Sequence, residues 1–181
     1  MYGIGKLTLH QLFISKYYYI FVYTIIVMED ITIDKTIKSI HKMAISTKTV
    51  VNLMYTSRII EESIASTLRP YDLTIQQYNV LRILRGQRGN PCNLSTIQER
   101  MIDRSSNTTR LVDKLIAKEW VKRQICIENR RKVEIFITSS GLDVLKKLDP
   151  ITEHNNETIL KNLSGNQLEE LNQLLETLRT F

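Results

Sequence analysis

The hydrophobic period of this chain changes once, after Trp120, and that change restricts the fold more than any other feature. Upstream, apolar side chains recur every three or four residues, as on one face of a helix. Segments 121–127 and 132–138 instead alternate and are rich in β-branched residues, which is typical of paired strands. Helical spacing returns over 139–162 and 166–180. With only 6 Gly and 3 Pro in 181 residues, a turn-rich all-β fold is excluded. The chain is predicted to be mainly α with one small β-hairpin.

Three short helices are predicted immediately before the hairpin, over 74–86, about 93–101 and about 105–119. A turn at 102–104 separates the second of these helices from the third, and the hairpin that follows has a polar tip at 128–131. This order of elements is that of a winged helix-turn-helix. We therefore expect 74–138 to be a DNA-binding module.

The two ends of the domain are predicted to be longer helices. The first covers 47 to about 68 and is stopped by Pro70, and the helix at 139–162 is interrupted by Pro150. Segments 47–70 and 139–180 are predicted to form a dimerisation region. The terminal helices carry more apolar residues than so small a monomer is expected to bury alone, and a two-fold dimer would cover them. They are Leu145, Leu148, Ile151, Leu168, Leu171, Leu174, Leu175 and Leu178.

Charge is concentrated in the module at 74–138, which has 13 basic and 6 acidic residues, while 139–181 has 4 basic and 7 acidic residues. The basic excess favours a polyanionic partner, although a solvated basic surface would give the same counts. In the helix predicted at about 105–119, small polar residues at the N-terminus let the backbone approach DNA, and an arginine there can bind guanine. The predicted helix contacts are Ser105, Ser106, Asn107, Thr109, Arg110 and Lys114, although N-caps favour the same small polar residues. Arg130 and Arg131 are the predicted contacts of the hairpin tip, and Arg104 and Arg123 are predicted phosphate contacts.

Residues 1–30 do not share the pattern of residues 31–180 and are interpreted as an N-terminal extension. The run at 17–28 is uncharged but only 12 residues long, whereas a membrane-spanning helix needs about 20. A secretory signal is the alternative, but no small-residue cleavage pattern follows Val27. Met28 is therefore a candidate for the true start, and a cytoplasmic protein without a membrane partner is expected.

From about residue 47 to 180 the chain resembles the MarR family of dimeric transcription regulators. The motifs that carry the resemblance are Leu73-Thr74-x-x-Gln77-x-x-x-Leu81, Thr109-Arg110-Leu111-Val112-Asp113-Lys114-Leu115, Asn129-x-Arg131 followed by Ile137-Thr138-x-x-Gly141, and Leu163-Ser164-x-x-x-Leu168-Glu169-Glu170-Leu171. The resemblance implies a dimer with interlaced terminal helices, helix residues in the major groove and Arg131 in the flanking minor groove. It also implies a pocket for a small aromatic or phenolic effector near Tyr55, Arg58, Tyr71 and Tyr78, although these residues could equally be core and capping residues.

Two positions depart from the family pattern. Asn129 stands where the family has Asp, so the hairpin tip loses a carboxylate. Glu119 stands where the family prefers Gly, at a turn that typically needs a left-handed backbone.

Other chemistry is weakly represented in the sequence. The three His have no ligand spacing with one another or with the two Cys, so neither a metal nor another cofactor is expected, and no nucleophile–base arrangement indicates an enzyme. Cys126 lies near basic residues, which favour the reactive thiolate, and Cys92 is the other thiol. For both cysteines, redox sensing and simple packing as a small apolar residue are alternative roles.

Together these patterns predict a sequence-specific regulator that binds double-stranded DNA, a ligand-responsive repressor acting as a homodimer on a palindromic operator. The alternative is a winged-helix protein-interaction or assembly module that does not read DNA sequence.

Overall fold

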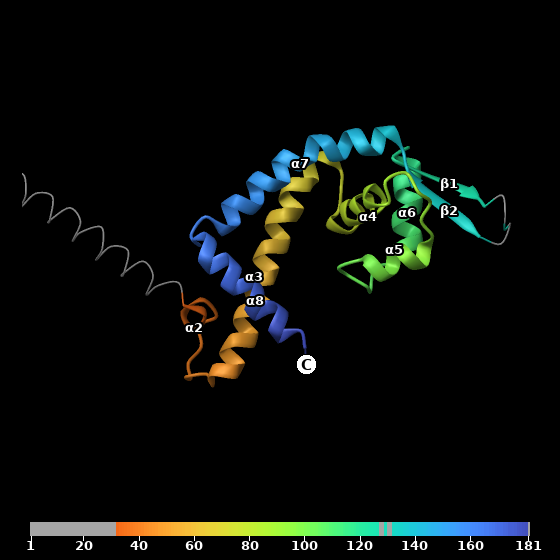
Figure 1. Cartoon of the computed structure of the whole chain (residues 1–181). Helices are drawn as coiled ribbons and strands as arrows, with labels where there is room; N and C mark the ends of the chain where they lie inside the picture. Colours follow the sequence, from red (N-terminus) through yellow and green to blue (C-terminus); the bar gives the residue numbers. More distant parts are fainter. Residues whose placement is uncertain (1–31, 127–128, 130–131, 181) are drawn as a thin grey trace, which may run out of the picture. The chain divides into compact units, whose positions relative to one another are not determined.

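The computed structural model describes residues 32–126, 129 and 132–180 (Figure 1). The chain divides into two compact units, Met1–Arg58 and Ile59–Phe181. The second unit contains the whole predicted DNA-binding module.

The first unit begins, in its described part, with the short helix α2 (Ile33–Thr36). The long helix α3 (Ile45–Leu68) starts in this unit and ends in the second. An ion pair between Asp34 and Lys48 connects α2 to the start of α3 and lowers the pKa of the Asp34 carboxyl group. The predicted extension at 1–30 lies outside the described residues.

The second unit has the predicted order of helices with one hairpin. Its elements are the end of α3, the 3₁₀ turn η1 (Arg69–Tyr71), α4 (Ile75–Gly86), α5 (Leu94–Arg100), α6 (Thr108–Ala117), β1 (Val121–Ile125), β2 (Val133–Ile137), α7 (Ser139–Leu160) and α8 (Gly165–Leu178). The fold class predicted from the change of period is thus confirmed.

Local sequence explains where several of these helices begin. The Thr74 hydroxyl accepts a hydrogen bond from the Gln77 amide (3.2 Å), and the Gln77 side chain accepts one from the Thr74 amide (3.0 Å). This capping box satisfies two amides that have no partner within the helix, and it fixes the start of α4. Asn93 caps α5 in the same position, through the Thr96 amide (2.8 Å).

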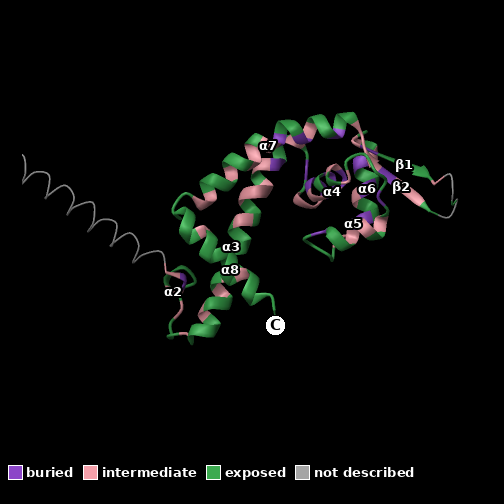
Figure 2. Ribbon diagram, in the orientation of Figure 1, coloured by how far each residue is buried: buried purple, intermediate pink, exposed green. Residues whose placement is uncertain are grey.

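The hairpin is a two-stranded antiparallel sheet in which Val121 pairs with Ile137 and Ile125 with Val133. Its base joins the helices through a bridge between Cys92 and Ile135, with backbone hydrogen bonds of 3.0 and 2.7 Å. Beyond Val121, the residues of β1 are exposed, and Figure 2 shows this strand almost entirely in the colour of exposed residues.

One hydrophobic core holds α4, α5, α6 and the hairpin base together, and it also includes the first half of α7. Its fully buried members are Leu68, Val80, Leu81, Leu84, Ile97, Val112, Leu115, Ile135, Leu145 and Leu148. Burial of each such side chain contributes about 1.5–3 kcal/mol. The core therefore fixes one side of α6 and leaves the opposite side free.

Two predictions about the dimerisation region need correction. Leu145 and Leu148 are fully buried within this single chain, so they need no partner subunit to cover them. Pro150 does not interrupt α7, which continues to Leu160. Pro150 cannot donate a hydrogen bond to the carbonyl group of Lys146, but both residues are exposed, so that water can satisfy this carbonyl group.

The turn before α6 is also longer than predicted. α6 begins at Thr108, with Asn107 as its N-cap, rather than near Ser105. At its other end, Glu119 has φ = 60°, which confirms that this position uses the left-handed conformation for which the family prefers Gly.

Gly141, the last residue of the motif Ile137-Thr138-x-x-Gly141, is required by close packing. A Cβ atom at this position would clash with the carbonyl oxygen of Trp120 and would lie 2.8 Å from Ile137 Cγ1. The Trp120 oxygen cannot move easily because it accepts a hydrogen bond from the Thr138 amide (3.0 Å).

We therefore expect Gly141→Ala to lower the free energy of unfolding by about 1–3 kcal/mol, as overpacking of a core does. Gly165→Ala is the matched control, because no atom lies within 4 Å of the added Cβ and Gly165 is the first residue of α8. Urea unfolding of both variants checks this prediction. Equal stabilities for the two variants would contradict it.

Candidate DNA-binding interface

The solvent-facing side of α6 carries the side chains that are predicted to read DNA. Thr109, Arg110 and Lys114 are exposed, while Val112 and Leu115 on the opposite side are fully buried. Asn107 Oδ1 accepts a hydrogen bond from the Arg110 amide (3.0 Å). Asn107 therefore acts as the N-cap of α6, and the Arg110 side chain extends from the first turn of the helix.

Ser105 and Ser106 lie in the turn before α6 and not on the helix. Their hydroxyl groups donate hydrogen bonds to the two carboxylate oxygens of Asp103, at 2.6 and 2.9 Å, and the Ser105 amide donates a third (3.0 Å). Hydrogen bonds from Ser105 and Ser106 hold the pKa of the Asp103 carboxyl group below its ordinary value. Both hydroxyl groups are thus engaged in shaping the turn.

Three polar residues whose role was not predicted from the sequence hold this turn in place. They are Asp103, Gln98 and Asn79. Gln98 of α5 donates to the carbonyl oxygen of Arg104 and accepts from the Thr108 hydroxyl. Asn79 of α4 accepts a hydrogen bond from the Ile102 amide (3.1 Å). Polar residues separated by 6 to 23 positions give no periodic signal, so no sequence pattern indicates these contacts.

The last turn of α6 is held separately. The Lys118 ammonium group donates to the main-chain oxygen and the carboxylate of Asp72, in the turn before α4, and lies 4.9 Å from the centre of the Trp120 ring. The hydrogen bond from Lys118, together with the charge of its ammonium group, lowers the pKa of the Asp72 carboxyl group. The ends of α6 are therefore both fixed by polar contacts outside the core.

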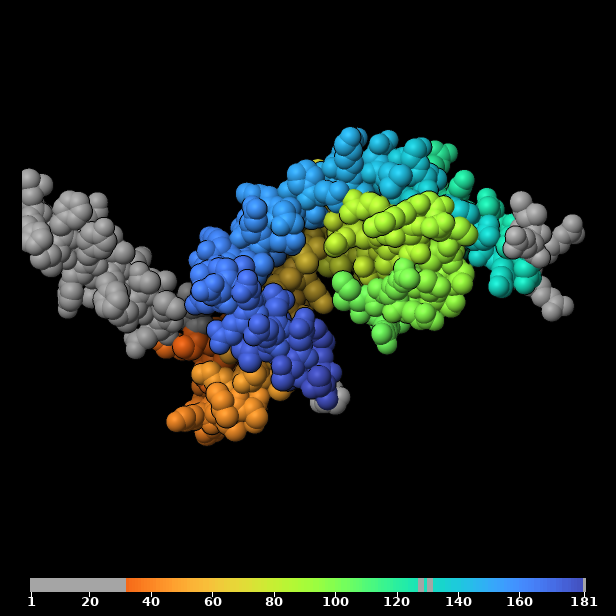
Figure 3. Space-filling view, viewed as in Figure 1, coloured from red at the N-terminus to blue at the C-terminus, as the bar shows by residue number. Residues whose placement is uncertain are grey.

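The predicted phosphate contacts and hairpin contacts differ in what surrounds them. Arg104 is exposed in the turn before α6. The Arg123 guanidinium of β1 lies 2.8 Å from the Asp113 carboxylate of α6. Arg130 and Arg131 lie outside the described residues. In Figure 3 the residues of β1 and β2 extend away from the helices of this unit.

Comparison of the sequence with known proteins identifies the family of this chain. A family model described as the MarR family matches residues 73–133. PecS, an HTH-type transcriptional regulator of Dickeya dadantii (strain 3937), is 30% identical over 124 residues, which cover 66% of this chain and 72% of PecS. The chain belongs to the MarR family. It is therefore a DNA-binding transcription regulator and not an enzyme.

Solved structures support the MarR assignment. A MarR transcription factor from Planctomyces limnophilus is 29% identical, with a TM-score of 0.60, over 76% of this chain and 99% of that chain. BpsR of Bordetella bronchiseptica, whose DNA binding is regulated by 6-hydroxynicotinic acid, has the same fold. Its TM-score is 0.67 at 20% identity, over 78% of this chain and 99% of BpsR.

The residues expected to form a MarR effector pocket are divided between the two compact units. Tyr78 lines a pocket of about 480 Å³ between α3, α4 and α7, but Tyr71 does not. Tyr55 and Arg58 belong to the first unit. The polar residues around this pocket are Thr67, Tyr78, Arg82, Arg85, Asp149, Thr152, Glu153, Asn155 and Asn156.

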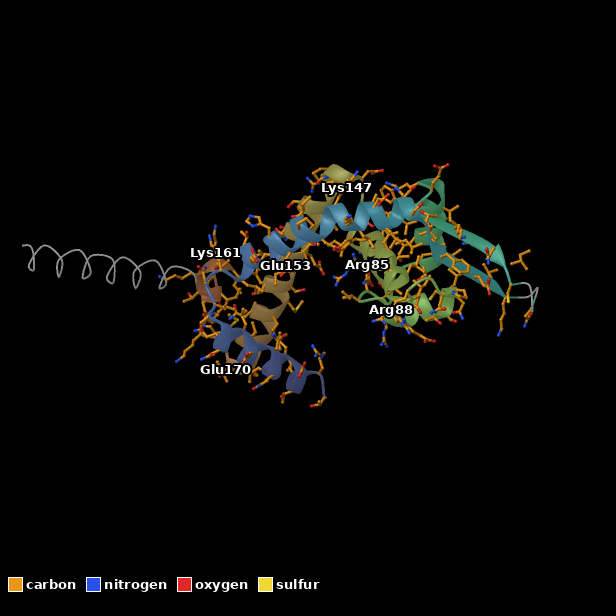
Figure 4. The ribbon with its side chains drawn as sticks, turned by 45° about the horizontal axis from the view of Figure 1, so that its top comes forward. Arg85, Arg88, Lys147, Glu153, Lys161 and Glu170 are labelled. Carbon is orange, nitrogen blue, oxygen red and sulfur yellow. The ribbon has the colours of Figure 1, made fainter. Side chains whose placement is uncertain are left out.

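Several of these polar groups contact one another. The Tyr78 hydroxyl lies 3.2 Å from the Thr152 hydroxyl, and the Arg82 guanidinium lies 5.7 Å from the centre of the Tyr78 ring. Arg85 of α4 lies next to α7 and donates to both carboxylate oxygens of Asp149, at 3.0 and 2.7 Å (Figure 4). These contacts connect the DNA-binding module to α7.

The cysteines differ in their surroundings. Cys92 is buried at the hairpin base, and burial raises the pKa of its thiol, so that less of the reactive thiolate is present. Cys126 is half-buried at the end of the first strand. Within the described part of the chain, no group of three or more His, Cys, Asp and Glu could hold a metal ion.

None of the helices in the described ranges is both long enough and apolar enough to cross a membrane. The apolar run at 17–28 is not among those residues.

The lowered pKa of Asp103 predicts a pH-dependent contribution to stability. Because the folded-state pKa lies below the ordinary value of 3.8, the contribution is complete above that value and is lost as the pH falls through the folded-state pKa. We expect Asp103→Asn to be less stable than the wild type at pH 6, and this difference to shrink toward pH 2.5. Urea unfolding of both chains in steps across this range measures it. A difference that does not change with pH would contradict the role of the carboxylate.

Proposed function

We propose that this MarR-family protein is a repressor that binds a palindromic operator as a dimer and releases it when a small ligand binds. The observation that carries the proposal is the exposed side of α6, where Thr109, Arg110 and Lys114 face solvent while the other side is fixed in the core. A helix held in this way can enter the major groove of DNA, which admits an α-helix.

Arg110 is the residue we assign to base reading. It lies in the first turn of α6, and an arginine there is long enough to donate two hydrogen bonds to one guanine. The hairpin would contact the flanking minor groove through Arg131, by the family pattern. A narrow minor groove attracts arginine but distinguishes few sequences, so this contact would add affinity more than specificity.

Exposed apolar residues on the terminal helices support a dimer. On α8, Leu171, Leu174 and Leu178 are exposed, and on α3 the same holds for Val50 and Met54. Side chains of this kind, repeated along a helix, indicate a surface that another chain covers. A two-fold dimer would present two copies of α6 to two half-sites about 34–36 Å apart.

A ligand response is supported by the pocket at Tyr78. Arg82 provides a cation beside the aromatic ring, so that a small aromatic or phenolic acid is the expected ligand. BpsR offers a precedent for such a ligand. Because the Arg85–Asp149 pair lies beside the same pocket, a ligand there would act on the connection between α4 and α7.

Arg110→Ala should remove base contacts at a cost of about 1–3 kcal/mol and should flatten the preference for cognate over scrambled DNA. Fluorescence anisotropy with both duplexes at several salt concentrations measures affinity and preference. Arg131→Ala should weaken both duplexes more evenly and reduce the salt slope by about one.

Arg179→Ala is the matched control, because it removes the same charge at the end of α8, outside the DNA-binding module. It should leave the preference unchanged. If the wild type binds cognate and scrambled duplexes equally at all salt concentrations, the protein is an interaction module and not a sequence reader.

Leu174→Glu should weaken the dimer. Leu174 is 60% exposed in the single chain and would be buried in the proposed dimer, where a charge is costly to bury. Analytical ultracentrifugation at micromolar concentration should give a dimer for the wild type and dissociation for the variant. Glu170→Gln, on the same helix, should leave the dimer intact. A stable wild-type monomer would contradict the proposal.

A further inference from the structure

The side of α6 that faces DNA in the proposed function contains an acidic residue. Asp113 lies four residues after Thr109 and three after Arg110, so that it shares their side of the helix. A carboxylate so close to a DNA-contacting side would be repelled by phosphate groups. Its presence there therefore calls for a physical reason.

The structure pairs this carboxylate with the hairpin. The Arg123 guanidinium lies 2.8 Å from Asp113 Oδ1, and the two side chains are 33% and 53% exposed, respectively. Arg123 lies in the middle of β1, opposite the buried Ile135. The ion pair thus connects the exposed side of α6 to the strand that leads to the hairpin tip.

The hairpin needs such a connection. Its strand β2 packs against the core through the buried Ile135 and the half-buried Val133 and Ile137, whereas β1 is exposed beyond Val121. The ladder continues for two residue pairs beyond Arg123, as far as Ile125, over about 7 Å at the usual rise of a strand. A two-stranded ribbon is marginally stable by itself, so a small change of angle at the base would displace its far end.

We propose that the Asp113–Arg123 pair positions the hairpin against α6, so that both elements fit one duplex at the same time. Arg123 is then a positioning residue and not a phosphate contact, in contrast to the sequence-based prediction. Asp113 contributes to DNA affinity despite its negative charge. This inference rests on the proposed function, because it concerns how the same interface is organised.

Two alternatives predict different results for the same variant. If Arg123 contacts phosphate and Asp113 only competes for it, Asp113→Asn would strengthen DNA binding, because it frees the guanidinium and removes a repelling charge. If Asp113 instead accepts a hydrogen bond from a cytosine amino group, Asp113→Asn would change the preference at one base pair.

The experiment compares the wild type, Asp113→Asn, Arg123→Gln and the double variant on two duplexes. The first is a duplex that the wild-type chain selects from a random-sequence pool, with flanking DNA on both sides. The second is the same duplex trimmed to the two half-sites, so that the hairpins have no flanking groove to contact. Anisotropy at constant salt measures the four affinities on each duplex.

We expect either single variant to lose affinity about two- to fivefold per half-site on the long duplex, as for an exposed ion pair. The double variant should lose no more than either single variant, because both substitutions break the same contact. On the trimmed duplex the variants should match the wild type. Stronger binding by Asp113→Asn, equal losses on both duplexes, or additive losses in the double variant would overturn the inference.

A measurement without DNA separates this inference from the proposed function. In the free protein, Asp113→Asn should speed the hydrogen exchange of the β1–β2 ladder amides and leave the amides of α6 unchanged. Unchanged exchange in the ladder would overturn the inference even if the wild type reads DNA. Absence of any selected duplex for the wild type would refute the proposed function, while the exchange measurement would still test the pairing.

Discussion

Burial of one side of α6 is the constraint on which the rest of the interface depends. Val112 and Leu115 are fully buried against α4 and α5, so the helix cannot rotate without exposing them to water. Because an α-helix has 3.6 residues per turn, burial of Val112 and Leu115 places Thr109, Arg110 and Asp113 on the side that faces solvent. The polar contacts at the two ends of α6 then set its position along its own axis. The core thus fixes the orientation of the surface that we propose to read DNA.

The sequence predicted those features that depend on local or periodic signals. The change of hydrophobic period located the hairpin, and Thr74 with Gln77 carries the signature of a capping box that the structure contains. The start of α6 could not be predicted, because Ser105, Ser106 and Asn107 are all suited to cap a helix. The choice among them depends on contacts with Asp103 and with other elements of the fold, which leave no trace in a local pattern.

Charge shows the same limit for the candidate site. The basic excess predicted a polyanionic partner, which agrees with DNA binding by the MarR family, but a count treats every arginine alike. Arg110 extends from a helix whose cap uses only its backbone amide, whereas the Arg123 guanidinium is paired with Asp113 and Arg85 with Asp149. The three arginines therefore have different roles in the proposed mechanism. Arg110 reads a base, Arg123 positions the hairpin, and Arg85 connects the module to α7.

The central claim is that α6 enters the major groove while the hairpin lies in the flanking groove. Dimethyl sulfate protection of the selected duplex tests this directly, because the reagent modifies guanine N7 in the major groove, where Arg110 would donate its hydrogen bonds. The account predicts protected guanines in two half-sites about one helical turn apart, with protection lost in Arg110→Ala. Unprotected guanines throughout a duplex that the wild type binds tightly would contradict it.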